Sequence, residues 1–122
     1  MEFQYVTIGV SDLARSRRFY EDILGFKPDM NCENWQSYAI EGDAGFAITE
    51  EPELRRVPCS DVINFSLPEI DSLWERVRDR VRVESAPQVM PWGTRKFIIL
   101  DPDGMRLGFV EQKRVFDGDS GG

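Results

Sequence analysis

Residues 91–111 read PWGTRKFIILDPDGMRLGFVE, and this stretch decides the fold. Residues 94–100 are rich in β-branched and aromatic side chains, which favour a strand. Residues 101–104, DPDG, predict a tight turn, because proline presets φ and glycine accepts the strained last position. Residues 105–111 then return as the partner strand. The stretch is a β-hairpin preceded by a loop in which Trp92 stands between a proline and a glycine.

The pattern of elements occurs twice along the chain. Residues 5–10 predict a strand, residues 13–24 an amphipathic helix, and three more strands follow before residue 51. The second half repeats this order, with a strand at 62–67, a helix, two weak strand candidates at 81–83 and 89–90, and the hairpin. The second helix has one apolar stripe, which makes Trp74 a core residue; its members are Ile70, Leu73, Trp74, Val77 and Val81. The sequence therefore predicts an α+β fold of two βαβββ modules.

The length of 122 residues corresponds to one domain. We expect a single domain over 1–114, with module one at 1–50, a linker at 51–60 and module two at 61–114. Residues 115–122 are glycine-rich and acidic, and we expect a flexible tail there. Each helix would cover one face of its own sheet. Two such sheets side by side would form a cupped mixed or antiparallel sheet, with a groove lined by alternate strand residues.

The composition limits the classes of molecule that we expect this chain to bind. A net charge of −7 disfavours nucleic acid and anionic lipid and favours a cationic small molecule. No apolar run approaches the roughly 18 residues of a membrane span, and the N-terminal residues lack a signal-peptide pattern. Cys32 and Cys59 fit no metal or redox spacing, so we expect two free thiols in a reducing cytoplasm.

The chain contains no histidine. This removes the commonest metal ligand and the usual general base, and it argues against a zinc site or a serine–histidine triad. A site of carboxylates and carbonyls would suit magnesium or calcium, but no carboxylate loop with that spacing occurs. We expect no metal and no cofactor.

Residues 6–20, VTIGVSDLARSRRFY, with Leu24-Gly25-Phe26 and the closing hairpin, resemble the vicinal oxygen chelate superfamily. This superfamily holds glyoxalase I, extradiol dioxygenases, fosfomycin-resistance enzymes and bleomycin-resistance proteins, and the likeness covers residues 3–112. Its enzymes carry a metal in the groove, held by histidines and glutamates at four strand positions. The resemblance places Tyr5, Ala47, Val62 and Gly108 at those positions. None is a usual metal ligand, so the glyoxalase and dioxygenase activities are not implied.

The sequence most resembles the metal-free branch, the bleomycin-resistance proteins. In that group a homodimer forms two clefts at its interface, and each cleft sequesters a flat, positively charged drug without changing it. Residues 91–97 are similar to the signature of that group, which implies that Trp92 stacks on the ligand. Trp35 looks like the other half of this sandwich. An indole ring offers a large flat face and attracts cations.

We therefore expect a metal-independent antibiotic-binding protein that sequesters a planar, cationic small molecule in a groove at a dimer interface. We expect no catalytic residues. The candidate ligand-binding residues are Tyr5, Trp35, Tyr38, Phe46, Phe65, Trp92, Arg95, Phe109 and Glu111.

Alternatives stay open for several of these residues. Trp35 is alternatively a core residue under the first helix, Trp92 a loop anchor and Glu111 a solvent-facing carboxylate. The strand phenylalanines are mostly candidates for the core. Arg95 and its neighbour Lys96 alternate along their strand, so only one of them can face the groove. The alternative function is a metal-independent enzyme that uses a tyrosine, a glutamate or an arginine, and a third is a paralogue whose own side chains fill the groove.

Overall fold

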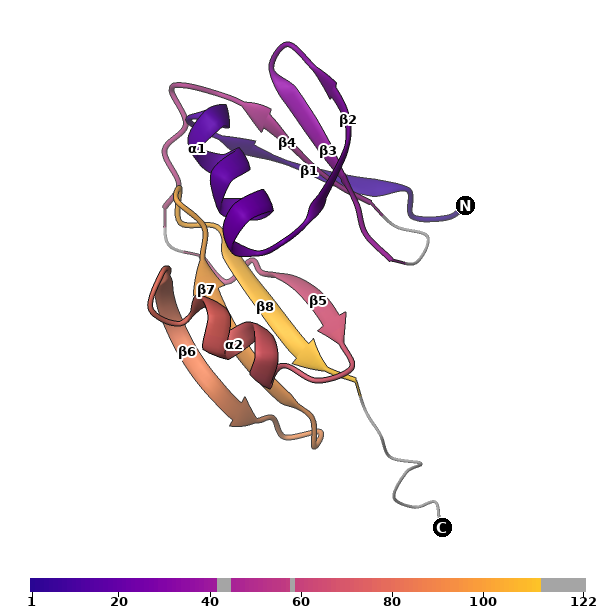
Figure 1. The fold of residues 1–122 in the computed structure, drawn as a ribbon, viewed down its shortest axis with the longest axis vertical. Coiled ribbons are helices and arrows are strands. Elements are labelled where there is room, and N and C mark those ends of the chain that lie inside the picture. Colours follow the sequence, from indigo (N-terminus) through magenta and orange to yellow (C-terminus); the bar gives the residue numbers. More distant parts are fainter. Residues whose placement is uncertain (42–44, 58, 113–122) are drawn as a thin grey trace. The chain divides into compact units, whose positions relative to one another are not determined.

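The computed structural model describes residues 1–41, 45–57 and 59–112. The chain divides into two compact units, Met1–Pro58 and Cys59–Gly122 (Figure 1). The predicted tail at 115–122 lies outside the described residues. Within the described ranges, no helix is long and apolar enough to cross a membrane.

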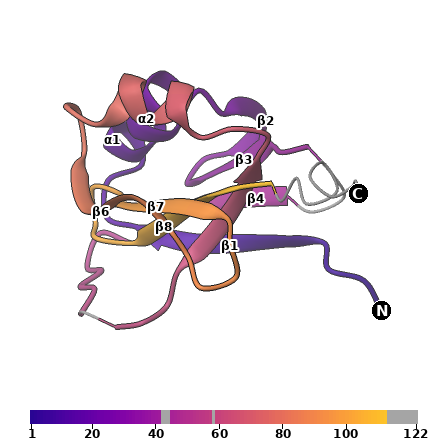
Figure 2. The same cartoon turned by 90° about the horizontal axis from the view of Figure 1, so that it is seen from below.

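Unit 1 is a four-stranded mixed sheet with one helical segment. The strand order is β1-β4-β3-β2; β1 pairs with β4 in parallel, and the other pairs are antiparallel. In Figure 2 the helix lies on one side of its own sheet. The elements are β1 (Tyr5–Val10), α1 (Leu13–Arg17), η1 (Arg18–Ile23), β2 (Lys27–Cys32), β3 (Trp35–Ala39) and β4 (Gly45–Glu50).

Unit 2 repeats this topology. Its strand order is β5-β8-β7-β6, again with one parallel pair, between β5 and β8. The elements are β5 (Ile63–Leu67), α2 (Asp71–Val77), β6 (Arg82–Val89), β7 (Arg95–Leu100) and β8 (Arg106–Glu111). The prediction of two βαβββ modules is confirmed. The two weak strand candidates of the second half are the ends of one strand, β6, whose pairing with β7 shifts register twice.

The first helix begins as predicted and then changes geometry. The Asp12 carboxylate accepts the backbone N–H of Arg15 at 3.0 Å and caps the helix. From Arg18 onward the segment is a π-helix, η1, rather than the uninterrupted α-helix that the periodicity predicted. The wider turn places two consecutive rings, Phe19 and Tyr20, in the core. Gly25, at φ 83°, ends the segment in the left-handed region.

The second helix buries most of the apolar stripe that the sequence predicted. Ile70, Leu73 and Val77 are buried. Trp74 is half-buried rather than fully enclosed: its ring lies 5.1 Å from that of Phe97. The Arg78 guanidinium is 5.8 Å from the same indole, so it shields part of the ring from solvent.

The predicted turn at 101–104 is held by a buried carboxylate. Asp101 is fully buried, and its Oδ1 accepts the backbone N–H groups of Asp103 at 2.9 Å and Met105 at 2.8 Å. Gly104 has φ 92°, a conformation that other residues adopt only with strain. The turn therefore depends on Asp101 for its hydrogen bonds and on Gly104 for its shape.

We predict that Asp101→Ala lowers the free energy of unfolding by about 2–3 kcal/mol, because one buried and one partly buried backbone N–H group lose a charged acceptor. Urea unfolding followed by circular dichroism measures this change. Asp79→Ala, in the same unit but with a side chain 91% exposed, is the control, and we expect a change within about 0.5 kcal/mol. Equal stabilities of the two variants would contradict this role of Asp101.

Candidate functional site

The helix-facing side of the unit 1 sheet is an aromatic core. The Tyr20 ring lies 5.1 Å from that of Phe46 and 6.1 Å from that of Tyr38, and Phe26 joins the same cluster. Tyr38 and Phe46 are each 2% exposed. Both border the hollow described next, but their rings pack against the helix side, so they support the site instead of presenting a face to a ligand.

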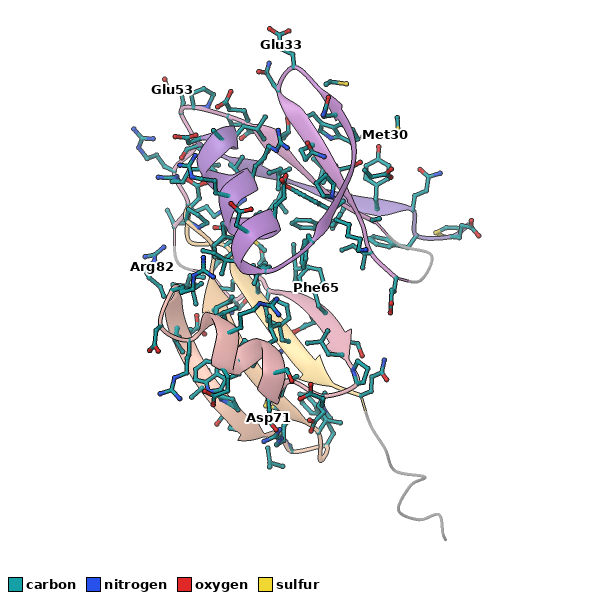
Figure 3. The ribbon with its side chains drawn as sticks, viewed as in Figure 1. Met30, Glu33, Glu53, Phe65, Asp71 and Arg82 are labelled. Atoms are coloured by element: carbon teal, nitrogen blue, oxygen red, sulfur yellow. The ribbon has the colours of Figure 1, made fainter. Side chains whose placement is uncertain are left out.

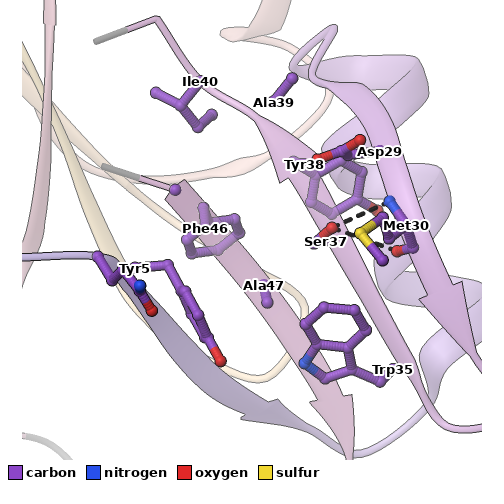
Figure 4. A pocket seen from close by; sticks show the side chains of 12 residues that line it. Tyr5, Asp29, Met30, Trp35, Ser37, Tyr38, Ala39, Ile40, Phe46 and Ala47 are labelled. Atoms are coloured by element: carbon purple, nitrogen blue, oxygen red, sulfur yellow. Dashed lines mark hydrogen bonds between the residues drawn. The ribbon is translucent and has the colours of Figure 1, made fainter. Parts of the chain in front are cut away.

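The opposite side of the same sheet is hollowed. A cavity of about 330 Å³ opens there, and all of its lining residues belong to unit 1 (Figure 4). The side chains that stand in it come from all four strands of this sheet, because alternate residues of a strand point to the same face. They are Tyr5 on β1, Met30 on β2, Trp35 and Ser37 on β3, and Ala47 on β4.

Two aromatic rings stand over a floor of small residues. Gly45 pairs with Tyr5, and Ala47 pairs with Ser37, so the middle strand β4 carries almost no side-chain bulk on this face. Figure 4 shows the rings of Tyr5 and Trp35 on either side of Ala47. A side-chain carbon at Gly45 would come 3.3 Å from the Tyr5 Cβ and narrow the space. Tyr5 is 53% exposed and Trp35 half-buried, so both rings remain accessible.

The two polar side chains of the hollow have different roles. Ser37 Oγ accepts the backbone N–H of Met30 at 3.0 Å and lies 3.3 Å from the Met30 carbonyl, so this hydroxyl ties β2 to β3. Asp29 also lines the hollow and brings a carboxylate to its rim. Rings with a nearby negative charge favour a flat ligand that carries a cation.

A partly buried ionic network holds β3 to the helical segment. The Tyr38 hydroxyl donates to Glu21 Oε2 at 2.8 Å, and Arg17 Nε donates to the same oxygen at 2.8 Å. Burial alone would raise the pKa of Glu21, but the hydrogen bonds from Arg17 and Tyr38 outweigh it and leave that pKa lowered. Burial and the neighbouring carboxylate raise the pKa of Tyr38. The phenol stays neutral and acts as a donor that positions β3 behind the hollow.

In unit 2, two of the candidate residues are part of the aromatic core. The Phe109 ring stacks between Phe65 at 5.4 Å and Phe97 at 5.2 Å, and Phe97 contacts Trp74 of α2. Phe65 and Phe109 therefore lie on the helix-facing side of their sheet, with Phe109 only 2% exposed. The open alternative for the strand phenylalanines, a place in the core, is what the structure shows.

Two further candidates form ion pairs with each other. Arg95 Nε lies 3.2 Å from Glu111 Oε1, and Arg95 Nη2 lies 2.8 Å from Oδ2 of Asp71. Figure 3 shows Asp71 at the start of α2. Arg95 donates hydrogen bonds to Glu111 and Asp71, and they raise the pKa of Arg95 above its usual value. Arg95 thus faces the helix side, and Lys96 is the residue of this pair that faces the other side. The charges of Arg95 and Glu111 therefore compensate each other.

Trp92 lies in a loop that the backbone closes tightly. The Gly93 N–H donates to the Met90 carbonyl and the Met90 N–H to the Thr94 carbonyl, each at 2.8 Å. Gly93 has φ 101°, which explains the glycine after the tryptophan. The Trp92 side chain is 55% exposed. A stacking role for Trp92 stays a prediction.

The positions implied for metal ligands do not fit a metal. Ala47, Val62 and Gly108 have no ligating side chain, and Tyr5 offers a single phenol. In the parts of the chain that the structure describes, no three cysteine, aspartate or glutamate side chains group together as a metal site. Cys32 and Cys59 are exposed free thiols, as expected.

The sequence interpretation missed several residues of the hollow, among them Met30. Gly45 and Asp29 line the hollow, and Ser37 braces it, yet none of them was a candidate. The signal was present as Gly45-Phe46-Ala47, in which a buried ring alternates with two residues that leave the opposite face bare.

Comparison with known proteins agrees with this architecture. The model of the Glyoxalase/Bleomycin resistance protein/Dioxygenase superfamily matches residues 2–109. None of the curated proteins matches the chain. Among solved structures, a member of the glyoxalase/bleomycin resistance protein/dioxygenase superfamily from Sphaerobacter thermophilus DSM 20745 is 25% identical, with a TM-score of 0.73 over 92% of this chain and 98% of that chain.

Two further structures are similar over nearly the whole chain. A protein of unknown function from Agrobacterium tumefaciens str. C58 is 25% identical, with a TM-score of 0.76 over 93% of this chain and 95% of that chain. TnmS3, an antibiotic binding protein from Streptomyces sp. CB03234, is 23% identical, with a TM-score of 0.74 over 93% of this chain and 97% of that chain. At this identity the likeness to TnmS3 shows a common fold.

We predict that the ionic network behind the hollow makes stability depend on pH. Because the pKa of Glu21 is lowered in the folded protein, its contribution is complete above the usual value of 4.5 and is lost as pH falls through the folded pKa. The stability difference between the wild type and Glu21→Gln should therefore shrink from pH 6 to below pH 4. Chemical unfolding at several pH values measures it. A difference that stays constant over this range would contradict the assignment.

Proposed function

The chain belongs to the Glyoxalase/Bleomycin resistance protein/Dioxygenase superfamily, and we propose that it is a metal-independent antibiotic-binding protein of the cytoplasm. It sequesters a planar, cationic small molecule and leaves it chemically unchanged. Like the bleomycin-resistance proteins that the sequence resembles, it acts as a homodimer with the ligand groove at the dimer interface. The likeness in fold to TnmS3, an antibiotic binding protein, supports this proposal.

The observation that carries the proposal is the pair of accessible rings, Tyr5 and Trp35, over the floor formed by Gly45 and Ala47. A flat heteroaromatic group entering the hollow would lie against ring faces with few rotamers to freeze. Each aromatic stack contributes about 0.5–1.5 kcal/mol beyond the area that it buries. The Asp29 carboxylate at the rim and the net charge of −7 favour a ligand that is positively charged.

The other candidate residues differ in whether they would touch the ligand or support the site. Tyr38 and Phe46 hold the floor from beneath, since their rings fix the strands that carry the hollow. Trp92 offers a further ring for stacking, from a loop in which it stays exposed. Arg95 and Glu111 already neutralise each other, and Phe65 and Phe109 stack on each other on the helix-facing side, so these four shape the sheet rather than touch the ligand.

We predict that bleomycin, or another planar cationic antibiotic from a small panel, quenches tryptophan fluorescence with saturation at about one ligand per subunit. Addition of a chelator should leave the titration unchanged, because no metal takes part. Mass spectrometry of the recovered ligand should find it intact. Flat titrations across the whole panel would refute sequestration of such drugs, and a chemically altered ligand would point to the alternative, a metal-independent enzyme that uses the Tyr5 hydroxyl.

We predict that Trp35→Ala weakens binding of the ligand found in that panel about three- to tenfold, the loss expected for one aromatic stack. Trp35→Phe keeps a flat ring and should recover part of the affinity. Phe3→Ala removes another aromatic of unit 1, 64% exposed and outside the hollow, and should bind like the wild type. Calorimetric titration measures all three variants. If Trp35→Ala and Phe3→Ala bind equally well, the ligand does not stack on Trp35.

A further inference from the structure

On the open face of the unit 2 sheet, the space over Gly108 is filled by the side chains of two neighbouring strands. This residue pairs with Asn64 on one side and with Ile98 on the other. A side-chain carbon built at Gly108 would lie 2.2 Å from Asn64 Oδ1 and 2.8 Å from Lys96 Cε. The amide of Asn64 and the stem of Lys96 therefore converge over a residue that has no side chain of its own.

Lys96 has no ion pair within the part of unit 2 that the structure describes, unlike two arginines of the same sheet. On the helix side, Arg95 pairs with Asp71 and Glu111. On β8, Arg106 Nε donates to Glu84 at 2.8 Å, so that pair is neutral as well. Lys96 is half-buried, and none of the carboxylates in the described part of the chain lies within ion-pair distance of it.

We propose that Lys96 and Asn64 form a subsite for an organic carboxylate on the open face of the unit 2 sheet. The ammonium, one bond beyond Cε, has three donors and neutralises a single negative charge. The neighbouring amide can donate to the second carboxylate oxygen. Gly108 leaves room for both side chains, because any larger residue would displace the Asn64 amide.

The local groups, and not the overall charge of the protein, favour a carboxylate as the ligand. With a net charge of −7 the protein repels anions at long range, so a bound anion reports a local site. Charge-assisted hydrogen bonds from an ammonium are also about twice as strong as those between neutral groups. One ammonium matches one carboxylate, whereas a phosphate dianion would keep an uncompensated charge. This subsite does not depend on the proposed antibiotic binding, since it uses none of the residues of the unit 1 hollow.

The test is a titration of the isotope-labelled protein with sodium acetate, without antibiotic, followed by the backbone amide signal of Gly108. Sodium chloride at matched ionic strength is the control for screening. We expect a saturable shift with acetate and none with chloride. In Lys96→Gln the dissociation constant should rise at least about tenfold, the loss of one charge-assisted hydrogen bond. Lys96→Arg should retain binding.

Further variants separate the subsite from general charge effects. Lys27→Gln removes an exposed lysine of β2 and should titrate like the wild type. Gly108→Ala and Asn64→Ala should each weaken binding, the first because the new methyl group displaces the amide. Equal shifts with chloride and acetate, or unchanged binding in both Lys96→Gln and Asn64→Ala, would overturn the subsite. Saturable binding of inorganic phosphate without binding of acetate would overturn the assignment to a carboxylate.

Discussion

Stacked aromatic rings fix each sheet to its helix, and this packing decides which side chains remain for binding. In unit 1 the ring centroids of Tyr38 and Phe46 are 6.2 Å apart, and both rings contact Tyr20. Because side chains alternate along a strand, burying these rings turns Ser37 and Ala47 to the other face. The hollow is therefore a consequence of the core. A substitution that loosened the rings would change the floor of the site even though it touched no ligand.

The two modules share a topology but present different chemistry on their open faces. In unit 1 the open face carries the rings of Tyr5 and Trp35 with a carboxylate at the rim. In unit 2 it carries the Lys96 stem and the Asn64 amide over Gly108. The first surface suits flat and cationic groups, and the second suits an anion. Repetition of a fold thus fixes where side chains point, while the residue at each alternate position decides what they can bind.

The repeat, the hairpin turn and the helix stripe followed from the sequence because each depends on local rules: strand alternation, turn chemistry and a period of 3.6 residues. Several site residues could be assigned only from the three-dimensional structure. Once Phe97 and Phe109 are in the core, alternation also assigns Arg95 and Glu111 to the helix side, but the partner that completes their ion pairs, Asp71, comes from another element. The change to a π-helix at η1 has no comparable signal, since it depends on how Phe19 and Tyr20 pack together.

The three tryptophans provide the most direct test of the central claim, that the unit 1 hollow receives the ligand on Trp35. They occupy distinct settings: Trp35 lines the hollow, Trp74 packs on Phe97, and Trp92 is exposed. Fluorine NMR of protein labelled with 5-fluorotryptophan would follow all three during a titration with the planar cationic antibiotic. A ligand seated on Trp35 should cause a saturable shift of the Trp35 signal while that of Trp74 stays in place. Saturable binding that leaves the Trp35 signal unmoved would contradict this claim.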